Sequence, residues 1–411
     1  MVALLLLILC MASSCSCRRI ESDHSPRKKL LQAPAAGNQV FNVMDFGAAG
    51  NGQSDDSQAF VKAWEAACGC VQGIPTVVIP AGNTFLLNPV ELEGPCKSNT
   101  LLVQAFGSIV APSSLDIWEN SEKGNWIVFK EVDGLTIDGA GTGEINGHGE
   151  AWWEQCDNQN CNRPVSLRIQ KCNAFKVSGL KFVNSPKGHI GLSGSSDGDL
   201  SGLAFVAPDE SPNTDGIDLS NCTGIDIHDS IFTTGDDCVA INGGCSFINI
   251  TNVRCGPGHG ISVGSLGEDG SHETVEEVNV QNCSFIKTQN GVRIKTWQGG
   301  SGYAKKIHFH NIKLDNVKNP IIIDQYYCPI GSCKESSSAV EVSDVTFSMV
   351  TGTSASEEAI NLSCSGTPGC SNIVLDQVNI SPSEPSKKIS STCSNVRGRG
   401  VNVTPSVPCL S

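Results

Sequence analysis

The sequence predicts an all-β fold: a single-stranded right-handed parallel β-helix, a solenoid of stacked coils, with a short N-terminal helix. A pattern of one small residue followed by apolar–x–apolar returns along most of the chain, and a second β-branched run returns beside it. The chain also has 43 Gly, and glycine and asparagine turns separate the short runs. A β-sandwich or a propeller is disfavoured, because regularly spaced hairpin dipeptides and blade signatures are missing.

The start of the chain predicts export. Its first apolar run is about 10 residues long, too short to span a bilayer, and small residues follow it. We therefore expect a signal peptide over 1–24 and a linker or pro-segment over 25–40, where apolar periodicity is missing. The β-helix domain is expected over 41–411, and no later segment is apolar enough to span a membrane.

One segment, DDSQAFVKAWEAAC over 55–68, carries a strong helical signal. Phe60, Val61 and Trp64 suit one face of an amphipathic helix. Asp55 or Ser57 is expected to cap its N-terminus, so the aspartate doublet there is explained by the start of a helix.

Cysteine usage also fits an exported protein. The chain has 20 cysteines, which in a secreted protein imply disulfides. Three lie in or beside the signal, and the odd remainder implies at least one free thiol. The close pairs Cys328/Cys333 and Cys364/Cys370 are candidate local disulfides, and Cys393 and Cys409 are further candidates. No His/Cys cluster has zinc spacing, so we expect no metal and no cofactor.

The charge balance restricts the partners. A net charge of −14 disfavours nucleic acid, and a polyanion would be repelled unless cations gather locally. We expect a monomer with no nucleic-acid or membrane partner. Six N-x-S/T sequons, consistent with a glycoprotein, begin at Asn221, Asn249, Asn282, Asn361, Asn379 and Asn402.

The repeat aligns residues from different coils. It reads RPVSL from Arg163, GHIGL from Gly188, DGIDL from Asp215, DCVAI from Asp237, HGISV from His259, NGVRI from Asn290, NPIII from Asn319 and EAINL from Glu358. Asp215, Asp237 and His259 hold one position at equal steps of 22 residues. Since neighbouring strands lie about 4.8 Å apart, the three should form a ladder, with Asp236 beside the middle rung. Burial of a carboxylate is costly, so the strand should bend at the small residue and turn the ladder outward.

The same alignment places Arg293 two coils from Asp237, with Lys295 beside it. Hydrolysis of a glycosidic bond needs one carboxyl group to protonate the leaving oxygen and one to activate water. Crowding raises the pKa of one carboxyl and leaves another ionised, while the cations can hold a sugar carboxylate. Each motif alone is weak, but their joint occupancy of equivalent positions favours a catalytic groove.

Five ordered motifs resemble the signature blocks of polygalacturonases, the pectin-hydrolysing glycosidases. They are SPNTDGI (211–217), TGDDC (234–238), CGPGHGISVGSLG (255–267), NGVRIKTW (290–297) and NPIIIDQYYC (319–328). The segment 41–68 resembles the N-terminal block, so the likeness covers roughly 41–411. It implies a plant-type, secreted enzyme of the cell wall or apoplast. This enzyme would hydrolyse α-1,4-linked galacturonan in pectin with inversion and without a metal, with a role in wall degradation and remodelling.

The resemblance also implies residue roles. Asp236 would be the general acid, Asp215 and Asp237 would hold and activate water, and His259 would tune the acid. Asn213, Arg293, Lys295 and Tyr327 would bind substrate, and Cys238 and Cys255 would be paired. Asp218 stands where many plant members have His, and it adds a negative charge beside the doublet.

Endo action is favoured, and three alternatives stay open. An exo-polygalacturonase would have the same motifs with a differently closed groove. A pectate lyase shares the fold class but eliminates with calcium. A non-catalytic pectin-binding β-helix would keep the groove, yet binding alone needs no acid–base pair.

Overall fold

The computed structural model describes residues 39–410, apart from 119–123, 156–161, 330 and 332. The predicted signal peptide (1–24) lies outside the described residues, as does the predicted linker (25–40) up to residue 38. The first strand, β1 (Gln39–Asn42), begins two residues before the expected domain start. The described residues belong to one compact unit, Asn38–Ser411.

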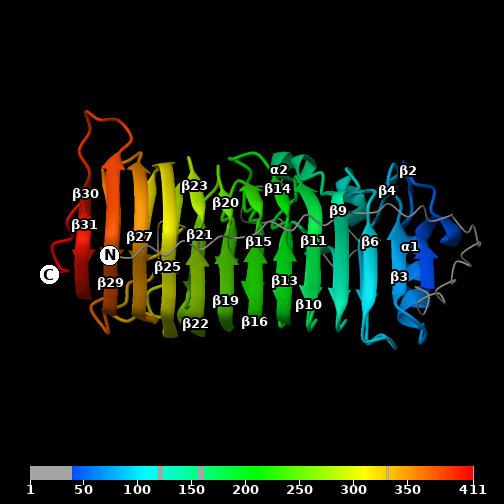
Figure 1. Ribbon diagram of the computed structural model, residues 1–411, viewed down its shortest axis with the longest axis horizontal. Coiled ribbons are helices and arrows are strands. Elements are labelled where there is room, and N and C mark those ends of the chain that lie inside the picture. Colours follow the sequence, from blue (N-terminus) through cyan, green and yellow to red (C-terminus); the bar gives the residue numbers. More distant parts are fainter. Residues whose placement is uncertain (1–38, 119–123, 156–161, 330, 332, 411) are drawn as a thin grey trace, which may run out of the picture. The chain divides into compact units, whose positions relative to one another are not determined.

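This unit is a stack of coils whose strands form two sheets (Figure 1). In the smaller sheet, which carries the candidate site, all neighbouring strands are parallel. Its eleven strands are β5 (Val90–Glu93), β8 (Asn125–Lys130), β10 (Val165–Gln170), β12 (Ile190–Ser193), β15 (Ile217–Ser220), β18 (Val239–Ile241), β21 (Ile261–Leu266), β24 (Asn290–Thr296), β26 (Asn319–Asp324), β28 (Glu358–Ser363) and β30 (Ser390–Ser394).

The larger sheet contains two parallel ladders that merge in long strands such as β9 and β25. Its 20 strands are β1, β2 (Asn51–Asp55), β3 (Pro75–Ile79), β4 (Thr84–Leu86), β6 (Leu101–Ala105), β7 (Ser108–Val110), β9 (Leu135–Asn146), β11 (Lys176–Val183), β13 (Ser196–Ser201), β14 (Ala204–Val206), β16 (Thr223–His228), β17 (Ile231–Thr233), β19 (Cys245–Thr251), β20 (Arg254–Cys255), β22 (His272–Gln281), β23 (Ser284–Ile286), β25 (Ser301–Val317), β27 (Glu341–Ser354), β29 (Cys370–Pro382) and β31 (Val396–Thr404). The predicted parallel β-helix is confirmed.

The predicted N-terminal helix is also confirmed, as α1 (Ser57–Cys68). Its buried face, which includes Phe60 and Trp64, packs on the first coil against β1, β3 and β5. The predicted cap is correct in part: the N-cap position is Asp56, whose side chain makes no cap hydrogen bond, but Asp55 accepts from the backbone amide of Ser57, the first residue of the helix, at 3.0 Å. Asp56 has another role. Its carboxylate accepts from the backbone amides of Ala49 and Gly50, because the preceding turn folds back on it.

The remaining helical segments are short. They are α2 (Glu150–Gln155) and the 3₁₀ turns η1 (Val43–Phe46), η2 (Leu115–Trp118) and η3 (Glu268–Gly270). Within the part of the chain that the structure describes, no helix is both long and apolar enough to cross a bilayer.

Aromatic side chains stack inside the coils beneath the candidate site. The register places Phe182, Phe205 and Phe232 at equivalent positions on β11, β14 and β17. Their rings stack with centroid separations of 5.2 Å and 4.5 Å, and each side chain is almost fully buried. Burial of one such side chain contributes roughly 1.5–3 kcal/mol. Phe232 lies in β17, and the turn with the aspartate doublet follows this strand, so the stack supports the strand that leads into that turn.

Candidate active site

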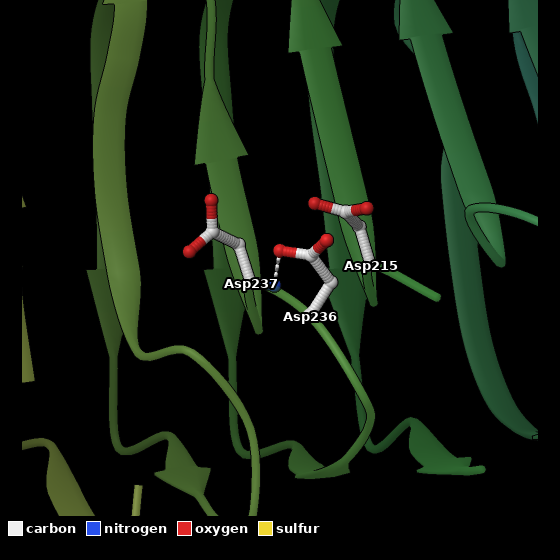
Figure 2. Close-up of side chains that lie close together, drawn as sticks. All are labelled: Asp215, Asp236 and Asp237. Carbon is white, nitrogen blue, oxygen red and sulfur yellow. Dashed lines mark hydrogen bonds between the residues drawn. The ribbon is translucent and has the colours of Figure 1, made fainter. Parts of the chain in front are cut away.

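Three neighbouring strands, β15, β18 and β21, bring the predicted ladder together. Their register places Asp215, Asp237 and His259 at equivalent positions on successive coils, as predicted. The backbone amide of Gly216 donates to the Asp237 carbonyl at 2.9 Å, which ties the first two rungs. Figure 2 shows Asp215, Asp236 and Asp237 on two adjacent coils, with their carboxylates close together.

The predicted alignment holds from GHIGL to EAINL but fails at RPVSL. Leu167, not Val165, pairs with Ile190 of the next coil. Strand β10 buries Val165, Leu167 and Ile169, so its alternation fits two registers that differ by two residues. Arg163 therefore lies about two residues before the repeat position that the alignment assigned to it.

The middle aspartate, Asp237, is held by three donors. Its Oδ1 accepts from Ser262 Oγ and from the Arg293 guanidinium, each at 2.8 Å, and its Oδ2 accepts from Lys295 Nζ at 2.8 Å. The ladder was expected to face outward. Asp237 does lie on the side of the sheet that carries Arg293 and Lys295, but these two side chains cover it, and only 1% of the residue is exposed. Burial opposes ionisation, yet the charges of Lys295 and Arg293 hold the pKa of this carboxyl below its usual range.

The aspartate on the preceding coil, Asp215, has the opposite tendency. It is half-buried, and loss of hydration raises the pKa of its carboxyl well above the usual range. The charges of Asp218, Asp236 and Asp237 add to this rise, and Lys295 partly offsets it. Asp215 and Asp237 thus differ in proton affinity. Asp237 stays ionised, whereas Asp215 can take up and release a proton.

The first member of the doublet, Asp236, is half-buried and has three polar neighbours. Its Oδ1 accepts from the Asp237 backbone amide at 2.8 Å and lies 3.0 Å from Nδ1 of His259. Its Oδ2 accepts from the Asn213 amide at 3.3 Å. The carboxyl is therefore fixed in orientation, and His259 touches the predicted acid, as expected from the resemblance.

Oxygen atoms of Asp215, Asp236 and Asp237 lie within 4.8 Å of one another, close enough to share one ligand atom. Both oxygens of Asp237 already accept bonds from protein cations, so the charge of the cluster is partly balanced without a metal ion. Such an arrangement can hold a water molecule and a glycosidic oxygen between the carboxyls.

The four residues predicted to bind substrate surround this cluster. Arg293 and Lys295 lie at its edge and contact Asp237, which the prediction did not anticipate. Lys295 Nζ lies 5.3 Å from the centre of the Tyr327 ring, a cation–π distance. Trp297 packs edge-on against Tyr327 at 5.7 Å and lines a cleft of about 550 Å³.

Sequence reasoning missed two residues that support the site. Arg163 is buried, and its guanidinium donates to Asn213 Oδ1 at 2.6 Å and to the Pro212 carbonyl. Asn213 in turn donates to Asp236, so Arg163 holds in place the side chain that contacts the predicted acid. The misplaced RPVSL register hid this residue. Ser262, between the two apolar residues of HGISV, was predicted only to face outward from its strand.

Every candidate disulfide among the described cysteines is confirmed: Cys238–Cys255, Cys328–Cys333, Cys364–Cys370 and Cys393–Cys409. The structure adds Cys68–Cys96, which links the end of α1 to the first coils. The sequence did not predict this pair, because the two cysteines are 28 residues apart. The prediction of a free thiol is confirmed as well. Among the described cysteines, Cys70, Cys172, Cys222, Cys245 and Cys283 are unpaired.

Comparison with known proteins agrees with this geometry. The model of glycosyl hydrolases family 28 matches residues 68–405. A probable polygalacturonase of Arabidopsis thaliana is 48% identical over 376 residues, which cover 90% of this chain and 80% of that protein. A second one is 41% identical over 422 residues, covering 100% and 94%. The endo-xylogalacturonan hydrolase of Aspergillus tubingensis superposes with a TM-score of 0.75 at 25% identity, covering 87% of this chain and 96% of that one. The predicted right-handed parallel β-helix agrees with this match.

Proposed function

Because the chain belongs to glycosyl hydrolases family 28, the polygalacturonase family, we propose that it cleaves α-1,4-galacturonosyl linkages inside the pectin polymer with inversion. The single observation that carries the proposal is geometric: oxygens of Asp215, Asp236 and Asp237 lie within 4.8 Å of one another, and Lys295 and Arg293 both form ion pairs with Asp237. These cations hold Asp237 as an anion, while burial raises the pKa of Asp215 on the neighbouring coil, so the cluster offers carboxyls of different proton affinity, as acid–base hydrolysis needs.

In this mechanism Asp236 is the general acid and gives its proton to the leaving glycosidic oxygen. Asp215 and Asp237 hold the attacking water between them. The water proton passes to Asp215, because a carboxylate with a raised pKa is the stronger base once it is ionised. Asp237 stays ionised and orients the water, while His259 keeps the Asp236 carboxyl in place.

Inverting glycosidases usually hold their carboxyls about 6.5–9.5 Å apart and retaining ones about 5–5.5 Å, so closely spaced carboxyls by themselves would suit retention. Here oxygens of the three aspartates lie within 4.8 Å. Retention would require a carboxylate that forms a covalent bond with the sugar. Both oxygens of Asp237 accept hydrogen bonds from protein donors, so this carboxylate is a poor nucleophile, which supports inversion. The anomer formed first, observed by NMR, tests this: a β product supports inversion, and an α product contradicts it.

Arg293, Lys295, Asn213 and Tyr327 are proposed to bind the uronate units beside the cleaved bond. Each ammonium or guanidinium has more donors than Asp237 uses, so the remaining N–H groups can meet a sugar carboxylate. Free polygalacturonate should therefore be a better substrate than the fully methyl-esterified polymer.

Endo action is proposed because the smaller sheet continues on both sides of the catalytic rung, from β5 to β15 and from β21 to β30. A polymer lying along this face would meet protein on either side of the cleaved bond. The protein is further proposed to act as a secreted monomer in cell wall pectin degradation and remodelling, in keeping with its disulfides.

One assay separates the alternatives. The purified protein is incubated with polygalacturonate, and viscosity, reducing ends and ultraviolet absorbance are followed with and without a calcium chelator. A rapid fall in viscosity at few new reducing ends supports endo hydrolysis, and a slow fall supports exo action. Calcium-dependent absorbance of an unsaturated product would identify a lyase, and binding without cleavage would identify a non-catalytic protein.

A further inference from the structure

A single outward-facing row of the smaller sheet connects the catalytic rung with a distant arginine. The register places these residues in one row, in the order Arg168, Gly191, Asp218, Ala240, Ser262 and Arg293. Arg293, after which the row continues to Ile322, forms an ion pair with Asp237. Arg168, on β10, is the same residue type three strands before the catalytic strand β18.

The Arg168 side chain lies along the sheet toward the site. Its Nε donates to Asn125 Oδ1 at 2.9 Å, which fixes the guanidinium plane. On the next strand, a Cβ at Gly191 would come within 2.4 Å of the Arg168 Nη1 and 2.6 Å of its Cζ. The missing side chain at Gly191 is therefore what lets the guanidinium lie flat over β12.

This guanidinium is attracted by Asp218 but forms no ion pair with it. Among the described residues, its terminal nitrogens donate no hydrogen bond and make no ion pair, unlike those of Arg293 and Arg163. The side chain is half-buried, and loss of hydration lowers the pKa of Arg168, against the attraction of Asp218. A partly desolvated cation with free donors is unfavourable by itself and favourable once a carboxylate binds it.

A second cation lies close by. Lys187 is exposed, and like Arg168 it acts on the charge of Asp218 without forming an ion pair with it. Burial and the charges of Asp236 and Asp237 raise the pKa of Asp218 to about 7. Below that pH this carboxyl is mostly neutral, so it does not repel an anionic ligand that approaches Arg168.

We propose that Arg168 is a second carboxylate-binding group of the groove, which holds a uronate unit of the polymer away from the cleaved bond. Strands lie about 4.8 Å apart, so a guanidinium over β12 is about two or three sugar units from the catalytic strand. This inference rests on the proposed function, and it adds a dependence on substrate length: only chains that reach β12 gain the contact.

The test compares Arg168→Gln with wild type on unesterified galacturonate oligomers from the trimer to the octamer. Lys181→Gln is the matched control, because it removes one charge from an exposed ion pair with Glu144 on the larger sheet. A charge-assisted bond corresponds to roughly tenfold or more in affinity, so KM for the hexamer and octamer should rise about tenfold. The kcat should change little, the rise in KM should be smaller for the trimer than for the octamer, and Arg168→Lys should recover part of the loss.

Three results would overturn the inference. One is an unchanged KM for long oligomers in Arg168→Gln. Another is an equal loss for the trimer and the octamer together with a lowered Tm, which would assign Arg168 to the scaffold. The third is an equal loss in the Lys181→Gln control. If the wild type cleaves no oligomer of any length, the proposed function itself fails, which is a separate outcome.

Discussion

Lys295 and Asp237 form a buried ion pair, with Nζ 2.8 Å from Oδ2 and side chains that are 9% and 1% exposed. The two residues belong to coils separated by β21, so the pair spans the width of the catalytic centre. Removal of one partner from a buried pair leaves an uncompensated charge. Lys295 therefore lowers the pKa values of Asp215 and Asp237, the proposed water-holding groups, in addition to its proposed contact with substrate.

The first prediction concerns Lys295→Met. We expect a higher KM on polygalacturonate and an acidic limb of the kcat/KM profile that moves to higher pH. Lys295 lowers the pKa of Asp237 and of Asp215, so its loss raises both, and both carboxyls then protonate at a higher pH. The shift is expected to be on the order of one pH unit. An unchanged KM with an unchanged limb would assign Lys295 to the scaffold alone.

The second prediction concerns Asp236→Asn, which keeps the shape of the side chain but removes the transferable proton. Turnover should fall by about 10²–10⁴-fold, as is typical of general acid–base groups, while the fold and substrate binding persist. Asp226→Asn, an exposed change on β16 of the larger sheet, is the control. Turnover within threefold of wild type would refute the assigned role.

The third prediction concerns the Cys238–Cys255 disulfide, which closes a segment of 17 residues at the catalytic rung. Its replacement by two serines should lower the free energy of unfolding by about 2–5 kcal/mol, measured by urea denaturation. Cys328–Cys333 closes a segment of 5 residues. Its loss should be smaller by about 1 kcal/mol, because stabilisation grows with loop length. Peptide mapping that finds both Cys238 and Cys255 as free thiols would contradict the first expectation.

The fourth prediction concerns Asp218 and the pH dependence of stability. Its carboxyl has a folded pKa of about 7, above its unfolded value, so the folded state binds the proton more tightly. This contribution is complete below the unfolded pKa and is lost as pH rises toward 7. Asp218→Asn should therefore stabilise the protein at pH 7 by about 1–2 kcal/mol, allowing for partial solvent screening, and have little effect near pH 4.

Thermal unfolding at both pH values checks this expectation. The exposed Asp209→Asn serves as the control, since it removes a carboxyl from a surface loop. An equal change in Tm at pH 4 and pH 7 would show that the Asp218 carboxyl does not titrate in this window.

The repeat was enough to predict the strand order and the ladder of Asp215, Asp237 and His259, because coils in register impose equivalent positions. The repeat predicted that Arg293 and Lys295 lie near Asp237, but not that they cover it. Equivalent positions on successive coils show which side chains are neighbours, and they do not show how deeply each side chain is buried. The register of RPVSL was ambiguous, because apolar residues alternate over three positions of β10, and a shift of the strand by two residues keeps the same side chains buried. Arg163 was missed for the same reason.

Other features left no sequence signal at all. The Cys68–Cys96 bridge joins residues 28 apart, so no spacing rule selects it from the alternatives. The free space over Gly191, which decides where the Arg168 guanidinium lies, depends on the neighbouring strand and is likewise invisible in a single sequence.

Each coil of this stack contacts chiefly the coils before and after it, so a local disturbance weakens with distance along the axis. The catalytic rung on β15 and β18 has several coils on either side. Transient opening of a terminal coil, or a cut by a protease there, therefore need not reach the aspartates. A protein built in this way can lose order at its ends while its central coils keep their structure.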